Sequence, residues 1–120
     1  MNKNRKQFKY YRLIQSINYL DRKEGSVKIY SNNSYLHELV KFQIAYKLKS
    51  QGYKVFTECR LSGGGRADIV AISKNSDGYI IEVINSETEA RFNKKLNDYP
   101  LEFDIIKVNC KDFDINSWDL

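Results

Sequence analysis

Long apolar runs, cysteine and proline are all scarce in this chain of 120 residues. It has no stretch of about 18 apolar residues, so we expect no helix that spans a membrane. The polar, basic N-terminus lacks the apolar core of a secretion signal. The two cysteines, Cys59 and Cys110, have no CxxC spacing, which argues against a zinc site. We therefore expect a cytoplasmic protein whose cysteines are reduced thiols buried in strands.

What the sequence does contain fits one small α/β domain. At 42% hydrophobic and 29% charged residues, the chain has room for one core, and we treat residues 1–120 as a single domain with residues 1–33 as a basic extension. Residues 1–60 carry 13 Lys and Arg against 4 Asp and Glu, whereas residues 61–120 carry 7 against 11. A basic half suits a polyanion such as nucleic acid, and a basic surface kept for solubility is the alternative.

The N-terminal segment mixes cations with aromatic rings. Residues 3–12 read KNRKQFKYYR, and Lys3, Arg5 and Lys6 are candidate contacts to phosphates. Rings beside such cations can stack on nucleic-acid bases. Alternatively, the same rings pack onto the domain as an ordinary amphipathic element.

Hydrophobic periodicity predicts a first helix and three strands. Apolar residues at a spacing of four predict a core-facing helix from about residue 34 to a glycine cap at Gly52; they are Leu36, Val40, Ile44 and Leu48, with Leu39 beside them. Alternation over 53–60 predicts a strand. Apolar runs over 67–72 and 79–84 predict two strands that are covered on both faces and joined as an antiparallel hairpin.

The C-terminal third predicts one more helix and one more strand. A capping box at Ser86 and Glu89 opens a helix to about residue 97, and Pro100 stops further helix. Residues 103–108 (FDIIKV) predict the last strand. The apolar residues of the tail over 111–120 indicate that part of it packs on the domain. The element order is therefore αβββαβ.

Two of the apolar strands each carry one carboxylate. Asp68 lies within ADIVAI and Glu82 within YIIEVI, although burying an unpaired charge is costly. Because these strands are predicted to pair, the two side chains can converge, and a divalent cation between them would offset their repulsion. Oxygen ligands favour Mg²⁺ or Mn²⁺, which can activate water toward a phosphodiester. Alternatively, each acid lies at a strand end and faces solvent or a lysine.

A glycine-rich turn directly precedes Asp68. Gly63, Gly64 and Gly65 permit close backbone approach by a large ligand such as a DNA duplex. Arg66 follows the turn and is a candidate phosphate contact.

These residues together resemble the PD-(D/E)XK nuclease superfamily. The resemblance rests on Glu38 in a helix, Gly52, Glu58, the Ser-Gly-Gly of 62–64, the ADIVA of 67–71 and the IEV of 81–83. It covers about residues 35–108 and is most similar to the small archaeal-type Holliday junction resolvases. It implies a restriction-endonuclease-like αβββαβ core, with a central mixed four-stranded sheet flanked by helices.

The resemblance also implies roles for individual residues. Asp68 and Glu82 match the family's two metal-binding acids, and the carbonyl of Val83 is a candidate third ligand. Glu38 matches the first-helix acid, which holds the metal or its water in many members. The cofactor implied is Mg²⁺ or Mn²⁺.

Several neighbouring residues have plainer interpretations. Glu38 alternatively faces solvent and pairs with a helical lysine, Lys41 or Lys49. We interpret His37 as a partly buried helix residue rather than a ligand. Glu58 is either an outer partner of the site or a member of a surface ion pair.

The chain departs from the family pattern at the motif lysine, where Ile84 stands. That lysine normally positions the attacking water and stabilises developing charge. Either a lysine from a neighbouring element, Lys41 or Lys94, takes its place with Asn85 as the nearest polar group, or the motif register is shifted, or the site has degenerated. Ala67 stands where the motif has proline, which is a mild change.

Three functions follow from this pattern. The first is a metal-dependent DNA endonuclease that hydrolyses phosphodiester bonds, on branched or otherwise structured DNA, and the resemblance implies a homodimer. The second is a catalytically inactive nuclease-like domain that binds nucleic acid or a protein partner. The third is an interaction module whose acids, Asp68 and Glu82, point to opposite faces of the sheet.

Overall fold

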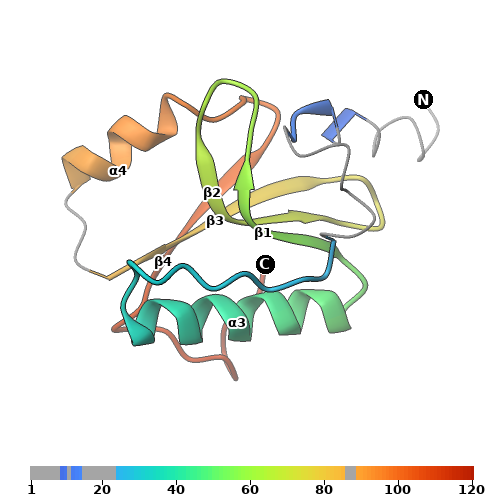
Figure 1. Ribbon diagram of the computed structural model, residues 1–120. Helices are drawn as coiled ribbons and strands as arrows, with labels where there is room; N and C mark the ends of the chain where they lie inside the picture. The colour runs from blue at the N-terminus through green and yellow to red at the C-terminus, as the bar shows by residue number, and fades with distance from the viewer. Residues whose placement is uncertain (1–8, 11, 15–23, 86–88) are drawn as a thin grey trace.

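The computed structural model describes residues 9–10, 12–14, 24–85 and 89–120 (Figure 1). Lys3, Arg5, Lys6 and the predicted cap at Ser86 lie outside these residues. The elements follow in the order α3 (Tyr35–Ser50), β1 (Lys54–Arg60), β2 (Arg66–Ile72), β3 (Gly78–Ile84), α4 (Glu89–Leu96) and β4 (Asp104–Asn109). The predicted αβββαβ order and α/β class are confirmed. Within the described part of the chain, no helix has the length and apolar content to span a bilayer.

The strands form a mixed sheet in the order β1-β2-β3-β4. β1, β2 and β3 pair antiparallel, so the predicted hairpin of β2 and β3 is confirmed, while β4 pairs parallel to β3. The parallel pairing requires a crossover, which α4 and its flanking segments supply. The short turn over 73–77 fixes the hairpin register, with Ile72 opposite Gly78 and Ile69 opposite Ile81.

Both faces of the sheet are covered, which explains why β2 and β3 are almost entirely apolar. On one face, α3 packs Val40, Ile44 and Leu48 against the strands, and the C-terminal tail adds Phe113 and Trp118. The predicted packing of the tail on the domain is therefore confirmed. α4 lies on the other side of the sheet (Figure 1).

The second face is closed partly by the N-terminal segment. Tyr10 and Ile14 are buried there, and Ile14 forms an isolated antiparallel bridge with Leu61. The Tyr10 ring lies where a side chain at position 78 would stand, because a Cβ on Gly78 would come within 2.2 Å of it. These residues of the predicted extension therefore belong to the core.

Helix α3 begins and ends as its sequence predicts, but its apolar stripe is shorter. Ser34 caps the N-terminus, and Gly52 follows the C-terminus with a φ of +94°. Leu36 and Leu39 were expected in the core, yet they are 38% and 36% exposed. A spacing of four advances about 40° beyond a full turn, so a residue three such steps before Leu48 has rotated away from the sheet.

Candidate functional site

The ladder between β2 and β3 stops where the two acids stand. Pairing runs from Ile72 opposite Gly78 to Ile69 opposite Ile81, and the next positions in that register are Asp68 and Glu82, which the ladder does not pair. On its other side, the β1–β2 ladder skips Glu58, which would lie opposite Asp68. Glu58 has a φ of +46°, which is uncommon for a residue with a side chain. The sheet is thus distorted at three carboxylates.

Asp68 is held at this opening by donors from two elements. Its Oδ2 accepts a hydrogen bond from the Val83 backbone N–H at 2.8 Å and lies 3.3 Å from His37 Nε2. Burial raises the pKa of Asp68, but hydrogen bonds from His37, Glu82 and Val83 outweigh burial and lower its pKa overall. Asp68 is therefore the ionised member of the acid pair.

Glu82 lies against Asp68 and is only 1% exposed. Its carboxyl group shares a hydrogen bond with that of Asp68 and accepts another from the Tyr99 hydroxyl. Burial, followed by the charge of Asp68, raises the pKa of Glu82 to about 10. The structure therefore brings the two predicted acids together, and at neutral pH they share one proton because two adjacent carboxylates cannot both ionise at low cost.

Glu38 and Lys41 lie behind this pair and contact each other. Lys41 Nζ is 2.6 Å from Glu38 Oε2 and 3.0 Å from Glu58 Oε1, and it donates to the Lys28 carbonyl at 2.6 Å. Lys41 is fully buried. The structure therefore places Lys41 in an ion-pair network with Glu38 and Glu58 rather than at the predicted position beside Asp68 and Glu82.

His37 separates Glu38 from Asp68. Its Nδ1 lies 3.2 Å from Glu38 Oε1, while its Nε2 faces Asp68. Burial lowers the pKa of His37, but the hydrogen bonds and charges of Asp68 and Glu38 outweigh burial and raise its pKa overall. For Glu38, burial raises the pKa, and hydrogen bonds from Lys41, Asn33 and the Tyr30 backbone lower it overall. The predicted metal ligand Glu38 thus reaches Asp68 only through His37.

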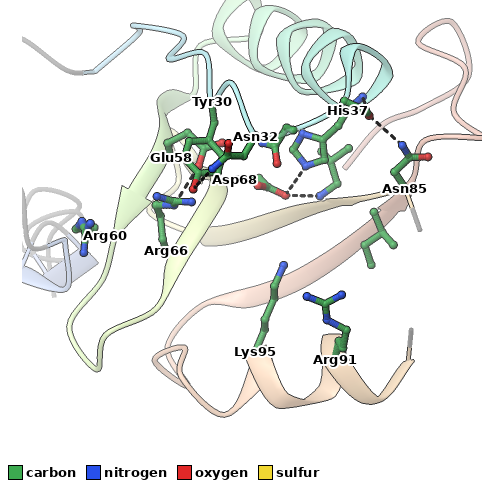
Figure 2. Close-up of a pocket in the computed structure, with 14 residues that line it drawn as sticks. Tyr30, Asn32, His37, Glu58, Arg60, Arg66, Asp68, Asn85, Arg91 and Lys95 are labelled. Atoms are coloured by element: carbon green, nitrogen blue, oxygen red, sulfur yellow. Dashed lines mark hydrogen bonds and ion pairs between the residues drawn. The ribbon is translucent and has the colours of Figure 1, made fainter. Parts of the chain in front are cut away.

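A polar cleft of about 640 Å³ opens beside Asp68. Figure 2 shows Lys95 and Arg91 projecting from α4 toward Asp68 and His37, with Arg60 and Arg66 on the β1–β2 side. The positive charge of Lys95 partly opposes the rise in the pKa of Glu82. Lys94 is exposed and does not line the cleft. Lys95 therefore takes the cleft position that was predicted for Lys94, because one step along a helix turns a side chain by about 100°.

The glycine turn packs against the chain itself. A Cβ at Gly65 would lie 2.7 Å from the Tyr99 ring, and one at Gly63 would lie 3.1 Å from the Asp98 carbonyl oxygen. Gly64 has no atom within 4 Å of a built Cβ and has a φ of +97°. Close approach therefore serves internal packing at two of the three glycines, and DNA contact at the turn stays a prediction.

Arg66 lines the cleft and already has two partners. Its guanidinium stacks 4.2 Å from the centre of the Tyr30 ring, and its Nε lies 3.3 Å from Glu58 Oε2. This side chain is 38% exposed. Tyr30 and Glu58 thus hold Arg66 at the cleft wall, and a guanidinium is the type of group that binds phosphate.

The donor atoms of the acid pair fit a small divalent cation. In the described residues, no group of three or more His, Cys, Asp or Glu side chains is arranged to hold a metal ion. Magnesium, however, usually binds through one or two carboxylates and keeps several waters. Asp68, Glu82 and the Val83 carbonyl supply that chemistry, and the proton shared by the acids occupies a position that a cation can take over.

The sequence did not point to several residues of the site. On the cleft walls these are Arg60, Arg91 and Lys95, and beside the acid pair they are His37 and Tyr99. His37 was interpreted as a helix residue without a site role, and Tyr99 was not considered. The local sequence of Tyr99 gives no signal, because its contact with Glu82 is made across the fold. For His37, the adjacent Glu38 and the helix start were the available signal.

Family models, curated proteins and solved structures were all compared with the chain, and none matches it. The resemblance to PD-(D/E)XK nucleases therefore rests on the chain's own residues, and its fold agrees with the element order that the resemblance implies.

Proposed function

We propose that this protein is a metal-dependent nuclease that hydrolyses phosphodiester bonds in DNA. The observation that carries the proposal is the Asp68–Glu82 pair, mostly buried and in contact at the edge of a cleft with cationic walls. Replacing a buried polar pair with apolar residues is often neutral or stabilising, so stability alone gives no reason for two adjacent acids. A cation site facing a polyanion gives one.

The residues divide the work among three parts of the cleft. Asp68 and Glu82, with the Val83 carbonyl, hold Mg²⁺ or Mn²⁺. When bound, the ion neutralises phosphate charge and makes a water more acidic. Lys95 stands on the opposite wall and takes the electrostatic part of the motif lysine that Ile84 replaces. Three arginines along the walls bind flanking phosphates; they are Arg60, Arg66 and Arg91.

The inactive nuclease-like domain is the second candidate, and Ile84 is the observation that favours it. Ile84 is 8% exposed, so the place of the motif lysine is apolar and nearly closed to solvent. Such a domain would bind DNA through the same cationic walls without cutting it. Its binding would weaken steeply with salt, because it would rest on phosphate contacts.

A cleavage assay separates the two candidates. Supercoiled, linear and four-way-junction DNA are incubated with Mg²⁺ or Mn²⁺ and the wild type, Asp68→Ala, Glu82→Gln or Asp104→Asn. Asp104 is an exposed acid on β4 and serves as the control. We expect cleavage by the wild type and the control, and a loss of about 10³-fold or more in the other two.

Two results would count against the nuclease. Cleavage that persists in both Asp68→Ala and Glu82→Gln would remove the site from the reaction. Salt-sensitive DNA binding by the wild type without any cleavage would select the inactive domain. Preferential cutting of the four-way junction would extend the proposal to branched DNA, and paired cuts in two of its strands would extend it to the implied homodimer.

A further inference from the structure

His37 occupies a position that neither its helix nor the core explains. It lies in the first turn of α3 and is 8% exposed. Each of its ring nitrogens faces a different carboxylate: Nδ1 is 3.2 Å from Glu38 Oε1, and Nε2 is 3.3 Å from Asp68 Oδ2. Helix capping uses only its backbone N–H, which donates to Ser34 Oγ at 3.1 Å. The ring itself is therefore committed to two acids.

The contact with Asp68 fixes the orientation of that carboxylate. The Val83 N–H donates to the same oxygen, Oδ2, at 2.8 Å. Val83 belongs to β3 and His37 to α3, so the two donors approach Oδ2 from different elements. Figure 2 shows the His37 ring directed at the Asp68 carboxylate beside the cleft. Two donors on one oxygen restrict the carboxylate plane and leave Oδ1 outside both contacts.

The other side of the His37 ring is held just as firmly. Glu38 accepts from Asn33 Nδ2 at 2.7 Å and from the Tyr30 N–H at 3.3 Å, and its Oε2 lies 2.6 Å from Lys41 Nζ. The acid behind the ring therefore has three other partners that keep it in place. Because Lys41 is fully buried, its ion pair anchors Glu38 inside the protein.

We propose that His37 is a positioning residue, which orients Asp68 for a divalent cation through a Glu38–His37–Asp68 relay. The inference rests on the proposed metal site at Asp68 and Glu82 and assigns Glu38 a role two contacts behind it. Groups that hydrogen-bond to metal ligands orient them, and their loss typically costs about 10- to 100-fold in metal affinity.

The test measures Mn²⁺ binding by calorimetry on the full chain without DNA, together with thermal unfolding in EDTA. His37→Phe keeps a ring but removes both nitrogens, and His37→Gln returns one N–H donor near the place of Nε2. Val40→Ala is the matched control, because Val40 is a buried residue of the same helix that packs in the core. It lowers stability without touching the relay.

We expect His37→Phe to bind Mn²⁺ about 10- to 100-fold more weakly than the wild type and His37→Gln to recover part of that loss. Val40→Ala should unfold at a lower temperature and bind Mn²⁺ like the wild type. If His37→Phe does not fold, Glu38→Gln carries the test with a loss of several-fold, because it removes the charge behind the ring and leaves His37 in place.

The outcomes separate this inference from the proposed function. The relay is overturned if His37→Phe binds Mn²⁺ as tightly as the wild type, or if Glu38→Gln does so where His37→Phe does not fold. The metal site still stands in that case if Asp68→Ala abolishes Mn²⁺ binding. Equal losses in His37→Phe and Val40→Ala also overturn it, since a purely structural effect would produce them. A wild type that binds no Mn²⁺ overturns the metal site and the relay together.

Discussion

The two ends of the β2–β3 hairpin are built for different purposes. From Ile69 opposite Ile81 to Ile72 opposite Gly78, the strands pair residue by residue, and all four isoleucines of this stretch are fully buried. Beyond Ile69 and Ile81 the ladder stops, and two acids, a neighbouring histidine and the cleft follow. The same two strands thus present an apolar, paired end and a polar, open end.

The difference shows what takes the place of a strand partner. At the paired end, backbone N–H groups donate across the ladder. At the open end, the Val83 N–H donates to the Asp68 side chain instead, so this backbone donor keeps a partner while a carboxylate enters the sheet. Stability is therefore concentrated at the paired end and the reactive groups at the open end.

The largest effect is expected from removing the ionisable group of Glu82. Its pKa is raised from 4.5 to about 10 in the folded protein, so between those values the folded state keeps a proton that the unfolded state has lost. Stability without metal must therefore fall as pH rises through this window, by at most about 1.4 kcal/mol per pH unit for one proton. Glu82→Gln should remove this slope and be the more stable protein at pH 8.

Chemical denaturation in EDTA from pH 5 to pH 8 measures this slope, and Asp104→Asn is again the control. The gain in Glu82→Gln should be smallest at pH 5 and should grow with pH. A gain that stays constant across the range would mean that Glu82 carries no extra proton in the fold. A variant that is both more stable and unable to cleave DNA would mark the open end as functional.

Two adjacent lysines on α4 sharpen the comparison from across the cleft. Lys95 lines the cleft and Lys94 does not. We expect Lys95→Ala to cleave DNA about 100-fold more slowly, which is the usual cost of a lost electrostatic contact to the reacting phosphate. Lys94→Ala should stay close to the wild type. Single-turnover cleavage rates measure both, and equal losses would indicate only a general loss of positive charge.

The sequence predicted the elements well because periodic patterns determine them locally. Val40, Ile44 and Leu48 identified the face of α3, and the acids stood out as charges in apolar strands. The pairing of β2 with β3 then required only their short turn. Local patterns of this kind are sufficient for the architecture and for bringing Asp68 close to Glu82.

The remaining site residues depend on contacts that no local pattern contains. Whether Lys94 or Lys95 faces the cleft depends on the rotation of a short polar helix, and a change of one residue turns it by about 100°. The role of Tyr99 depends on packing against Gly65, which is distant in sequence. The positive φ of Glu58 arises where two ladders are interrupted together.

Two substitutions in the glycine turn test whether Tyr99 maintains the geometry of the open end. A Cβ at Gly65 would overlap the Tyr99 ring, whose hydroxyl donates to Glu82. Gly65→Ala should therefore cost about 1–3 kcal/mol and slow cleavage as well. Gly64→Ala meets no atom of the chain but has a positive φ, so it should cost about 1 kcal/mol of strain and slow cleavage less than Gly65→Ala does. Denaturation and cleavage rates are measured for both variants. Equal changes in Gly65→Ala and Gly64→Ala would show that the Tyr99 contact does not maintain the geometry of the site.

The smallest effect belongs to the paired end. Ile80 is fully buried in the ladder opposite Val70, and Ile80→Val removes one methylene from the core. We expect a loss of about 1 kcal/mol in the free energy of unfolding. Cleavage by the folded protein should not change, because the ladder at this end contributes no group to the cleft. Slower cleavage at a temperature where the variant is fully folded would show that packing at the paired end also sets the geometry of Asp68 and Glu82, so the two ends would then act as one unit.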